Sequence, residues 1–213
     1  MSQDLKKKRW PTREVMSQIY DKKFWGGGTV DFYSGDGSHD ASFTRPYLTT
    51  VQKLLRAFPV KPSVCDLGCG DFNIGQALVS FASTYVGIDI VPKLIARNKE
   101  LFEQANLEFH CLDMVHEEWP TTDVVLLRQV MQHLSNAEIM KVVQKLKRVP
   151  YLIVTEHVPT GPYESNKDMV TSQGIRLKKK SGVDLMAPPF DLGAKNVQTV
   201  SYTHLTLPTI LRV

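Results

Sequence analysis

The sequence has few cysteines and no long apolar run. Its three cysteines, Cys65, Cys69 and Cys111, have no neighbours at zinc-ligand spacing, so we expect reduced thiols, no metal site and a cytoplasmic location. The longest uncharged stretch, residues 72–88, is interrupted by polar side chains. It therefore falls short of the about 18 apolar residues that indicate a membrane span. These absences predict a soluble protein without disulfide bonds.

Neither sign of charge dominates the sequence. Lys and Arg number 26 against 22 Asp and Glu, a net charge of +4 in a chain that is 42% hydrophobic. This composition is that of a globular domain and gives no reason to expect a nucleic-acid partner. The basic run 6–9 precedes polar residues rather than the apolar core of a signal peptide, so export is not expected. The lysines at 178–180 predict a solvated loop, with attraction of an anionic substrate as the alternative.

From residue 63 onward, short apolar runs alternate with amphipathic segments. This pattern predicts an α/β fold with a doubly wound, mainly parallel sheet. We expect amphipathic helices near 74–81, 94–102 and 139–146, the last preceded by a capping box from Ser135 to Glu138. The expected strands are residues 64–67, 85–88, 107–112, 123–127 and 151–155.

The first 62 residues predict two helices joined by a glycine-rich loop. The helices are expected near 15–20 and 47–58, with Thr44 as the cap and Pro46 in the first turn of the second. The loop, residues 24–40, is too rich in turn residues to predict a helix. Its aromatic residues either close over a ligand as a lid or pack the helices against the sheet; they are Trp25, Phe32 and Tyr33.

A second long irregular segment, residues 158–196, follows the last predicted strand. Irregular segments of this length inside a compact domain usually have a function. We therefore expect this segment to cover a substrate.

Acidic residues end three of the predicted strands. Asp66 precedes Gly68-Cys69-Gly70, a bend that lets a ligand lie against bare main chain. Asp89 follows Gly68 by 21 residues, close to the roughly 20 expected for a carboxylate that binds ribose hydroxyls. Asp113 ends the third strand, where a carboxylate accepts a hydrogen bond from an adenine amino group. Because parallel strands end at one edge of a sheet, the three acids predict an adenosine site.

The glycine pattern favours an adenosine compound other than a dinucleotide. A dinucleotide site needs a third small residue at the position that Asn73 occupies, so a nicotinamide-dependent oxidoreductase is the weaker interpretation. Asp66 is also unfavourable beside phosphates, whereas it suits the cationic amino group of a methionine moiety.

Three segments, 64–70, 87–90 and 111–114, resemble the successive cofactor motifs of class I S-adenosylmethionine-dependent methyltransferases. The resemblance covers about residues 63–157. It implies a Rossmann-like methyltransferase fold, S-adenosylmethionine as cofactor and a core domain over residues 63–199 on which residues 1–62 pack. The implied cofactor-binding residues are Asp66, Gly68, Cys69, Gly70, Asp89, Ile90, Asp113, Met114 and Arg128.

Two further expectations concern the methionine end of this site. Arg45 is expected to pair with the methionine carboxylate through a charge-assisted fork. Phe72 stands where the family often has a glycine, so its side chain is expected to narrow the methionine pocket.

Methyl transfer is a direct displacement, in which alignment alone is worth about 7–11 kcal/mol. A base is needed only when the acceptor atom carries a proton. Glu156 and His157, at the end of the fifth strand, are the candidate catalytic residues, and hydrogen bonding of both to loop backbone is the alternative. His133 is expected to cap its own turn. The acceptor is expected to be a small molecule methylated on O, N or C, and a non-catalytic binding module of the same fold is the alternative.

Residues 200–213 resemble a translated sequencing-adapter read-through. They begin where the resembled fold expects two closing strands. We therefore expect a non-native tail, a missing hairpin and an exposed edge at strand 151–155, with a sixth strand as the alternative.

Overall fold

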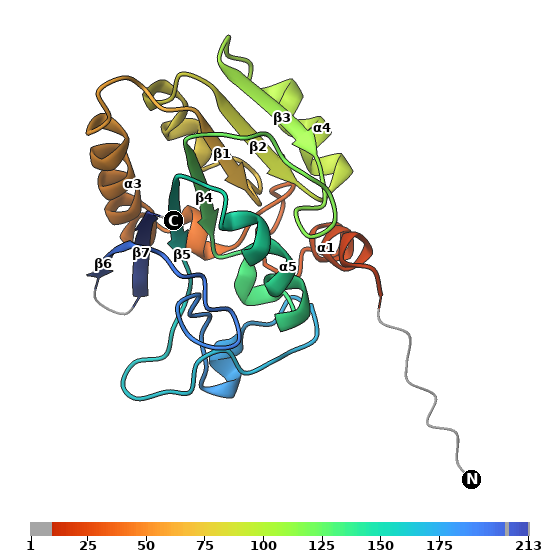
Figure 1. The fold of residues 1–213 in the computed structure, drawn as a ribbon. Helices are drawn as coiled ribbons and strands as arrows, with labels where there is room; N and C mark the ends of the chain where they lie inside the picture. The colour runs from red at the N-terminus through yellow and green to blue at the C-terminus, as the bar shows by residue number, and fades with distance from the viewer. Residues whose placement is uncertain (1–9, 203–204, 213) are drawn as a thin grey trace.

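A twisted sheet runs through the protein, which the computed structural model describes over residues 10–202 and 205–212. Within these residues the sheet has seven strands in the order β3-β2-β1-β4-β5-β7-β6 (Figure 1). Five strands are parallel, and β7 runs antiparallel to β5 and β6. The strands are β1 (Val64–Leu67), β2 (Tyr85–Asp89), β3 (Leu107–Cys111), β4 (Val124–Arg128), β5 (Tyr151–Thr155), β6 (Asn196–Tyr202) and β7 (Leu205–Arg212).

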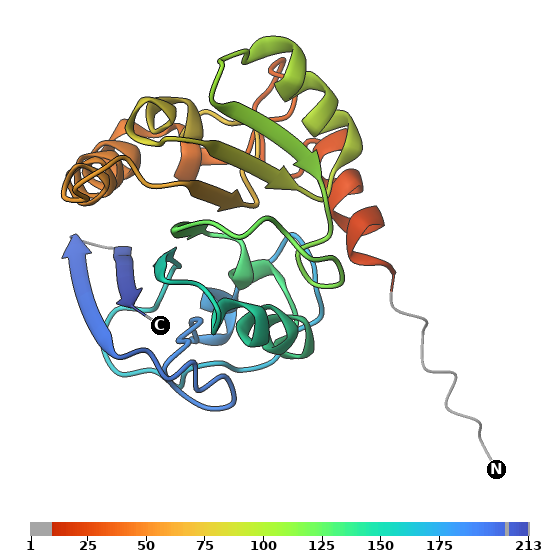
Figure 2. The same cartoon turned by 45° about the horizontal axis from the view of Figure 1, so that its top comes forward.

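Side chains from alternate strand positions enter two separate apolar clusters, one on each face of the sheet. Cys65 and Leu67 of β1 pack with α1 (Thr12–Asp21) and α5 (Asn136–Leu146). Val64 enters the other cluster, with α3 (Ala41–Arg56), the short helix η2 (Val79–Phe81) and the residues that flank η1 (Gly75–Ala77). Figure 2 shows α3 and α5 on opposite sides of the sheet. The predicted doubly wound α/β fold is therefore confirmed.

Most predicted elements lie within one or two residues of their observed bounds. The capping box is present, since the Ser135 hydroxyl accepts from the Glu138 N–H and the Glu138 carboxylate accepts from the Ser135 N–H. The helix predicted near 94–102 is α4 (Pro92–Leu101). The short elements that complete the fold are α2 (Asp36–His39), η3 (Met131–His133) and η4 (Arg176–Lys179).

The helix predicted over 74–81 is wrong, because η1 and η2 replace it. Phe72 has a left-handed backbone conformation, with φ of +64°. Its buried ring packs edge-on against Tyr85, Phe102 and Phe109. This aromatic packing holds the chain in a turn where a regular helix was expected.

The start of α3 also differs from the prediction. The Asp40 side chain accepts a hydrogen bond from Ser42 N at 2.7 Å, so Asp40 caps the helix in place of Thr44. Pro46 consequently lies inside the helix rather than in its first turn. The loop 24–40 contains the one-turn helix α2, which its composition did not predict.

At the other end of the sheet, β5 is not the exposed edge that the sequence analysis expected. Residues 151–154 pair with residues 209–212 of β7, and β6 pairs with the far side of β7. The two closing strands are thus present in the described residues. That residues 200–213 are non-native stays a prediction.

The segment 158–196 is mostly irregular, but it packs firmly on the α5 side of the sheet. Val183, Leu185, Phe190 and Leu192 are buried in the cluster that also holds α1 and α5. Among the helices that the structure describes, none is both long and apolar enough to cross a bilayer. The three cysteines are free.

Candidate functional site

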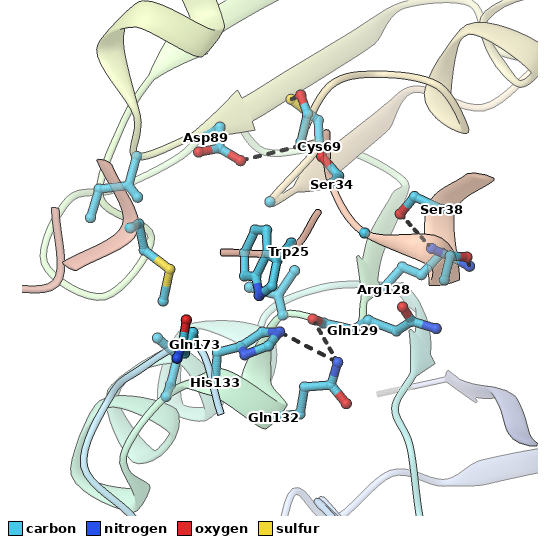
Figure 3. Close-up of a pocket in the computed structure, with 18 of the residues that line it drawn as sticks. Trp25, Ser34, Ser38, Cys69, Asp89, Arg128, Gln129, Gln132, His133 and Gln173 are labelled. Atoms are coloured by element: carbon cyan, nitrogen blue, oxygen red, sulfur yellow. Dashed lines mark hydrogen bonds between the residues drawn. The ribbon is translucent and has the colours of Figure 1, made fainter. Parts of the chain in front are cut away.

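A cavity of about 350 Å³ opens at the carboxyl ends of the parallel strands (Figure 3). Asp66, Asp89 and Asp113 all line it, so the structure brings together the three acids that end the first three strands. The N-terminal loop contributes Trp25, Ser34, Gly35, Gly37 and Ser38, and the segment 158–196 contributes residues 173–175 and Lys178. Most of the other predicted cofactor residues also line the cavity: Gly68, Cys69, Gly70, Ile90, Met114 and Arg128.

The bend after β1 depends on its two glycines. Gly68 has φ of +77° and Gly70 has φ of +56°, conformations that glycine adopts without a steric cost. A Cβ atom on Gly68 would overlap the side chain of Val130, and one on Gly70 would lie 2.6 Å from Ser34 Oγ. Main chain without side chains therefore forms this wall of the cavity.

Asp89 is a buried carboxylate with unused acceptor capacity. It accepts hydrogen bonds from Gly70 N at 3.2 Å and from Val91 N at 3.0 Å. The Ile90 N–H also acts on this carboxylate. A carboxylate offers about four acceptor positions, so room remains for a further donor. Burial raises the pKa of Asp89 to about 6, against the opposing effect of these backbone N–H groups. The group is thus mainly ionised at pH 7.

Asp113 lines the cavity, but its carboxylate is bound to its own turn. Val115 N donates to Oδ1 at 2.8 Å, and His116 Nδ1 lies 2.7 Å from Oδ2. The structure therefore places Asp113 as a wall of the cavity beside Ile90 and Met114. Its contact with an adenine amino group stays a prediction.

Asp66 on β1 and Arg128 on β4 come from strands that β2 separates from β3, which Asp113 follows. The hydroxyl of Tyr85 donates to Asp66 Oδ2 at 2.8 Å, and burial raises the pKa of Asp66 to about 6. Arg128 Nη1 donates to Ser38 Oγ at 3.1 Å, and Nη2 donates to the carbonyl of Gly37. The buried Arg128 Nε has no hydrogen-bond partner in residues 10–202 and 205–212. An unsatisfied buried donor of this kind favours a ligand that brings an acceptor.

Two predicted features of the methionine end are not where the sequence analysis expected them. Arg45 is exposed on α3 and lies outside the cavity lining, because Thr44 and Tyr47 take the buried face of that helix. Arg128 is the arginine that the structure places in the cavity. Phe72 also lies outside the lining, since its left-handed conformation directs the ring into the core. It does not narrow the cavity.

Glu156 is buried beneath the cavity rather than exposed within it. Its carboxylate accepts from Met131 N at 2.8 Å and from Gln132 N at 3.1 Å, and it is not part of the lining. Burial raises its pKa to about 8, while the two N–H groups and Arg176 act in the opposite direction. The geometry supports the alternative interpretation for Glu156, in which the carboxylate fixes the backbone of η3.

His157 does line the cavity, and a second imidazole accompanies it. The His157 ring lies between two amides, with Nδ1 2.8 Å from Gln132 Oε1 and Nε2 3.3 Å from Gln129 Nε2. His133 lines the same region, and its Nδ1 is 3.1 Å from the carbonyl oxygen of Gly174. Burial lowers the pKa of His133 to about 4, so this ring is neutral at pH 7. The expectation that His133 caps its own turn is wrong, because its Nδ1 lies against Gly174 of the segment 158–196. The sequence analysis missed this contact, since His133 follows the end of β4 by five residues and Gly174 is distant in sequence.

Of the three loop aromatics, only Trp25 reaches the cavity. Its ring centroid lies 5.2 Å from that of Tyr20 and 5.2 Å from that of His133. Phe32 packs on the core, and Tyr33 stacks on His39 at 4.3 Å. The lid interpretation thus applies to Trp25, and the packing interpretation applies to Phe32.

The segment 34–39 is attached to the glycine bend through Asp71. Ser34 N donates to Asp71 Oδ2 at 2.8 Å, and Asp71 N donates back to Ser34 Oγ at 2.8 Å. His39 Nε2 lies 2.6 Å from the same carboxylate oxygen. These bonds close the cavity over the end that contains Arg128.

Residues 64–150 match a family model described as a methyltransferase domain. A comparison with curated protein sequences gives no match.

Solved structures share the fold at low sequence identity. An N-methyltransferase, NodS from Bradyrhizobium japonicum WM9, in complex with S-adenosylhomocysteine, has a TM-score of 0.67 and 12% identity. The match covers 93% of this chain and 98% of that one. The magnesium protoporphyrin IX methyltransferase ChlM from Synechocystis PCC 6803, with bound S-adenosylmethionine, has a TM-score of 0.59 and 18% identity, over 95% and 96% of the two chains. At these identities the likeness concerns the fold.

Proposed function

We propose that the chain transfers a methyl group from S-adenosylmethionine to a small-molecule acceptor, a proposal that the match of residues 64–150 to a methyltransferase-domain model supports. One observation carries the proposal. Asp66, Asp89 and Asp113 line a single cavity beside a bare glycine bend. The similar structures that contain S-adenosylmethionine or S-adenosylhomocysteine support the same choice of cofactor.

The polar groups of the cavity suit the two ends of this cofactor. Asp89 has acceptor capacity left for the ribose hydroxyls, and Ile90 and Met114 offer apolar walls for the adenine ring. At the other end, Arg128 Nε has no partner among the residues that the structure describes and would donate to the methionine carboxylate. Asp66 is mainly ionised at pH 7 and would attract the cationic amino group.

The bound cofactor supplies a methyl group that its sulfonium already activates. The chain's own contribution is then to hold the acceptor in line with that methyl group and to exclude water. Trp25 and the lining residues Ser34, Gly35, Gly37 and Ser38 would exclude water. His157 is the proposed proton acceptor, while Glu156 keeps a supporting role through the η3 backbone.

Calorimetric titration with S-adenosylhomocysteine and with NAD tests the cofactor. We expect binding of the former and none of the latter, and the reverse result would favour the oxidoreductase alternative. Release of S-adenosylhomocysteine from S-adenosylmethionine with a mixture of acceptors tests turnover. Binding without any release would favour the non-catalytic module.

The variant Arg128→Lys tests the orientation of the cofactor, because it keeps the charge and removes Nε. We expect it to weaken binding of S-adenosylhomocysteine and to leave binding of 5′-methylthioadenosine, which lacks the amino-acid end, unchanged. Equal losses for both ligands would contradict the assignment of Arg128 to the carboxylate.

A further inference from the structure

A row of hydrogen bonds, in which each group donates to the next, lies at the ends of β4 and β5. It joins Gly174 O to His133 Nδ1 at 3.1 Å, His133 Nε2 to Gln132 Nε2 at 3.5 Å, and Gln132 Oε1 to His157 Nδ1 at 2.8 Å. Gln132 Nε2 also lies 3.2 Å from the carbonyl oxygen of Gln129. Figure 3 shows dashed lines from the Gln132 amide to His133 and to Gln129.

Two carbonyl oxygens in this row of hydrogen bonds, which can only accept, fix the positions of the ring and amide protons. A carbonyl oxygen only accepts, so Gly174 O requires the proton of neutral His133 to be on Nδ1. Gln129 O and the bare His133 Nε2 both require a donor, so the amide nitrogen of Gln132 faces them. Gln132 Oε1 then faces His157 and accepts its Nδ1 proton. The remaining lone pair of His157 is on Nε2, beside the Gln129 amide nitrogen.

The carboxylates that line the cavity come from one set of elements, and the ends of β4 and β5 contribute none among the described residues. Its carboxylates come from β1, β2 and the turns after β1 and β3, namely Asp66, Asp71, Asp89 and Asp113. The lining residues at the ends of β4 and β5 have uncharged side chains apart from Arg128, whose two Nη atoms are bound to Ser38 and Gly37. Lys178, the nearby lysine of the lining, is exposed.

This separation discriminates among acceptor groups. Among the described residues that line the cavity at the ends of β4 and β5, an ammonium group would find no carboxylate, because Glu156 lies beneath the lining. A carboxylate group would find only Arg128, whose two Nη atoms are already bound. A neutral O–H donor instead matches the Nε2 lone pair of His157, where it takes the place of the Gln129 amide nitrogen that lies 3.3 Å away.

We infer that the methyl acceptor is an uncharged hydroxyl compound whose O–H is bound and deprotonated by His157 Nε2, with Gln132 as the positioning residue that fixes the tautomer. This inference rests on the proposed function. The hydroxyl oxygen forms the new O–CH3 bond as its proton passes to His157 Nε2, and the electron pair of the broken S–CH3 bond stays on the sulfur of the donor. The imidazolium then releases its proton to solvent.

The groups that face His157 keep it able to accept this proton. Burial lowers the pKa of His157, and the neighbouring Arg128 guanidinium on β4 lowers it further. His133 on η3 is neutral at pH 7 and adds no charge. The ring is therefore neutral at pH 7, with its acceptor nitrogen unprotonated.

Nitrogen-15 NMR of the histidine rings, recorded on the protein with S-adenosylhomocysteine bound, tests the tautomer directly. We expect His157 to show a proton on Nδ1 only. Gln132→Met, which removes the amide, should give a mixture of both tautomers. Gln173→Met changes a residue that lines the cavity but takes no part in this row of hydrogen bonds, so it should leave the His157 signals unchanged. A proton on Nε2 of His157 in the unmodified protein would overturn the inference.

Three ring compounds with different head groups, phenol, benzylamine and benzoate, test the acceptor class on the same complex. We expect phenol to produce the largest change in the His157 Nε2 signal and to bind roughly fivefold more weakly to His157→Phe, the effect of one hydrogen bond. A larger change with benzylamine or benzoate, or no change with any of the three, would overturn it. Because S-adenosylhomocysteine binding is measured first and separately, failure of this inference is distinguishable from failure of the proposed function.

Discussion

Glu156 and Arg176 bind the same two residues of η3 from opposite sides. The Glu156 carboxylate accepts from the N–H groups of Met131 and Gln132, and Arg176 Nη1 donates to their carbonyl oxygens at 3.0 and 3.2 Å. Arg176 Nη2 also donates to Leu134 O at 2.7 Å. Only 1% of Arg176 is exposed. The segment 158–196 is thereby fixed to the turn that carries Gln132 and His133.

Replacing Arg176 should therefore destabilise the fold. Arg176→Met leaves three buried carbonyl oxygens without this donor and Glu156 without its nearby cation, so we expect a loss of about 2–5 kcal/mol in the free energy of unfolding. Lys179→Met is the matched control, because Lys179 is exposed and donates to a single carbonyl oxygen, Asp168 O at 2.7 Å, within the described part of the chain. Urea denaturation measures both. Equal stability of the two variants would show that Arg176 does not hold η3.

Alanine substitutions at two glycines distinguish the effect of backbone strain on stability from the effect of steric overlap. Gly68 and Gly161 have nearly the same φ, +77° and +79°. A Cβ atom would overlap Val130 at Gly68, whereas nothing lies within 4 Å of one at Gly161. We expect Gly68→Ala to cost about 1–3 kcal/mol more than Gly161→Ala, the usual effect of overpacking. Thermal unfolding compares the two, and equal losses would mean that the bend after β1 tolerates a side chain.

Asp89 should contribute strongly to cofactor affinity. In Asp89→Asn the side-chain oxygen still accepts one backbone N–H, but the charge and part of the acceptor capacity are lost. We expect S-adenosylhomocysteine binding to weaken by about 1.5–3 kcal/mol, the range for hydrogen bonds to a charged group. Asp31→Asn is the control, since the Asp31 side chain is 83% exposed and lies outside the cavity lining. Unchanged affinity of Asp89→Asn in calorimetry would refute the ribose assignment.

Cofactor binding should also weaken in mild acid. Burial raises the pKa values of Asp66 and Asp89 to about 6, so both carboxylates take up protons as the pH falls through 6 and lose acceptor capacity. The effect of these two groups on stability has the opposite sign. A folded-state pKa above the usual 3.8 means that their contribution to stability is complete below pH 3.8 and is lost as the pH rises through 6.

Calorimetry above and below pH 6, with unfolding measured in parallel, separates binding from stability. Asp89→Asn should show a flatter pH dependence of binding than the unmodified protein. Affinity that stays constant across pH 6 would contradict the role of both carboxylates.

The sequence by itself determined the parallel strands and the acidic residues at their ends. Strand β1 and the motif Asp66-Leu67-Gly68-Cys69-Gly70 are local patterns, since apolar runs, glycines and capping residues act over a few neighbours. Parallel strands end at one edge of the sheet. Because β1, β2 and β3 are neighbours, Asp66, Asp89 and Asp113 lie close together at that edge.

The tertiary structure alone decided where the other side chains point. Arg128 rather than Arg45 reaches the cavity, Phe72 turns into the core, and Glu156 lies beneath η3. The proton positions of His133, Gln132 and His157 depend on Gly174, which lies 41 residues beyond His133 in the chain. Such contacts join distant segments, and their direction depends on individual backbone torsions and packing partners that no local pattern specifies.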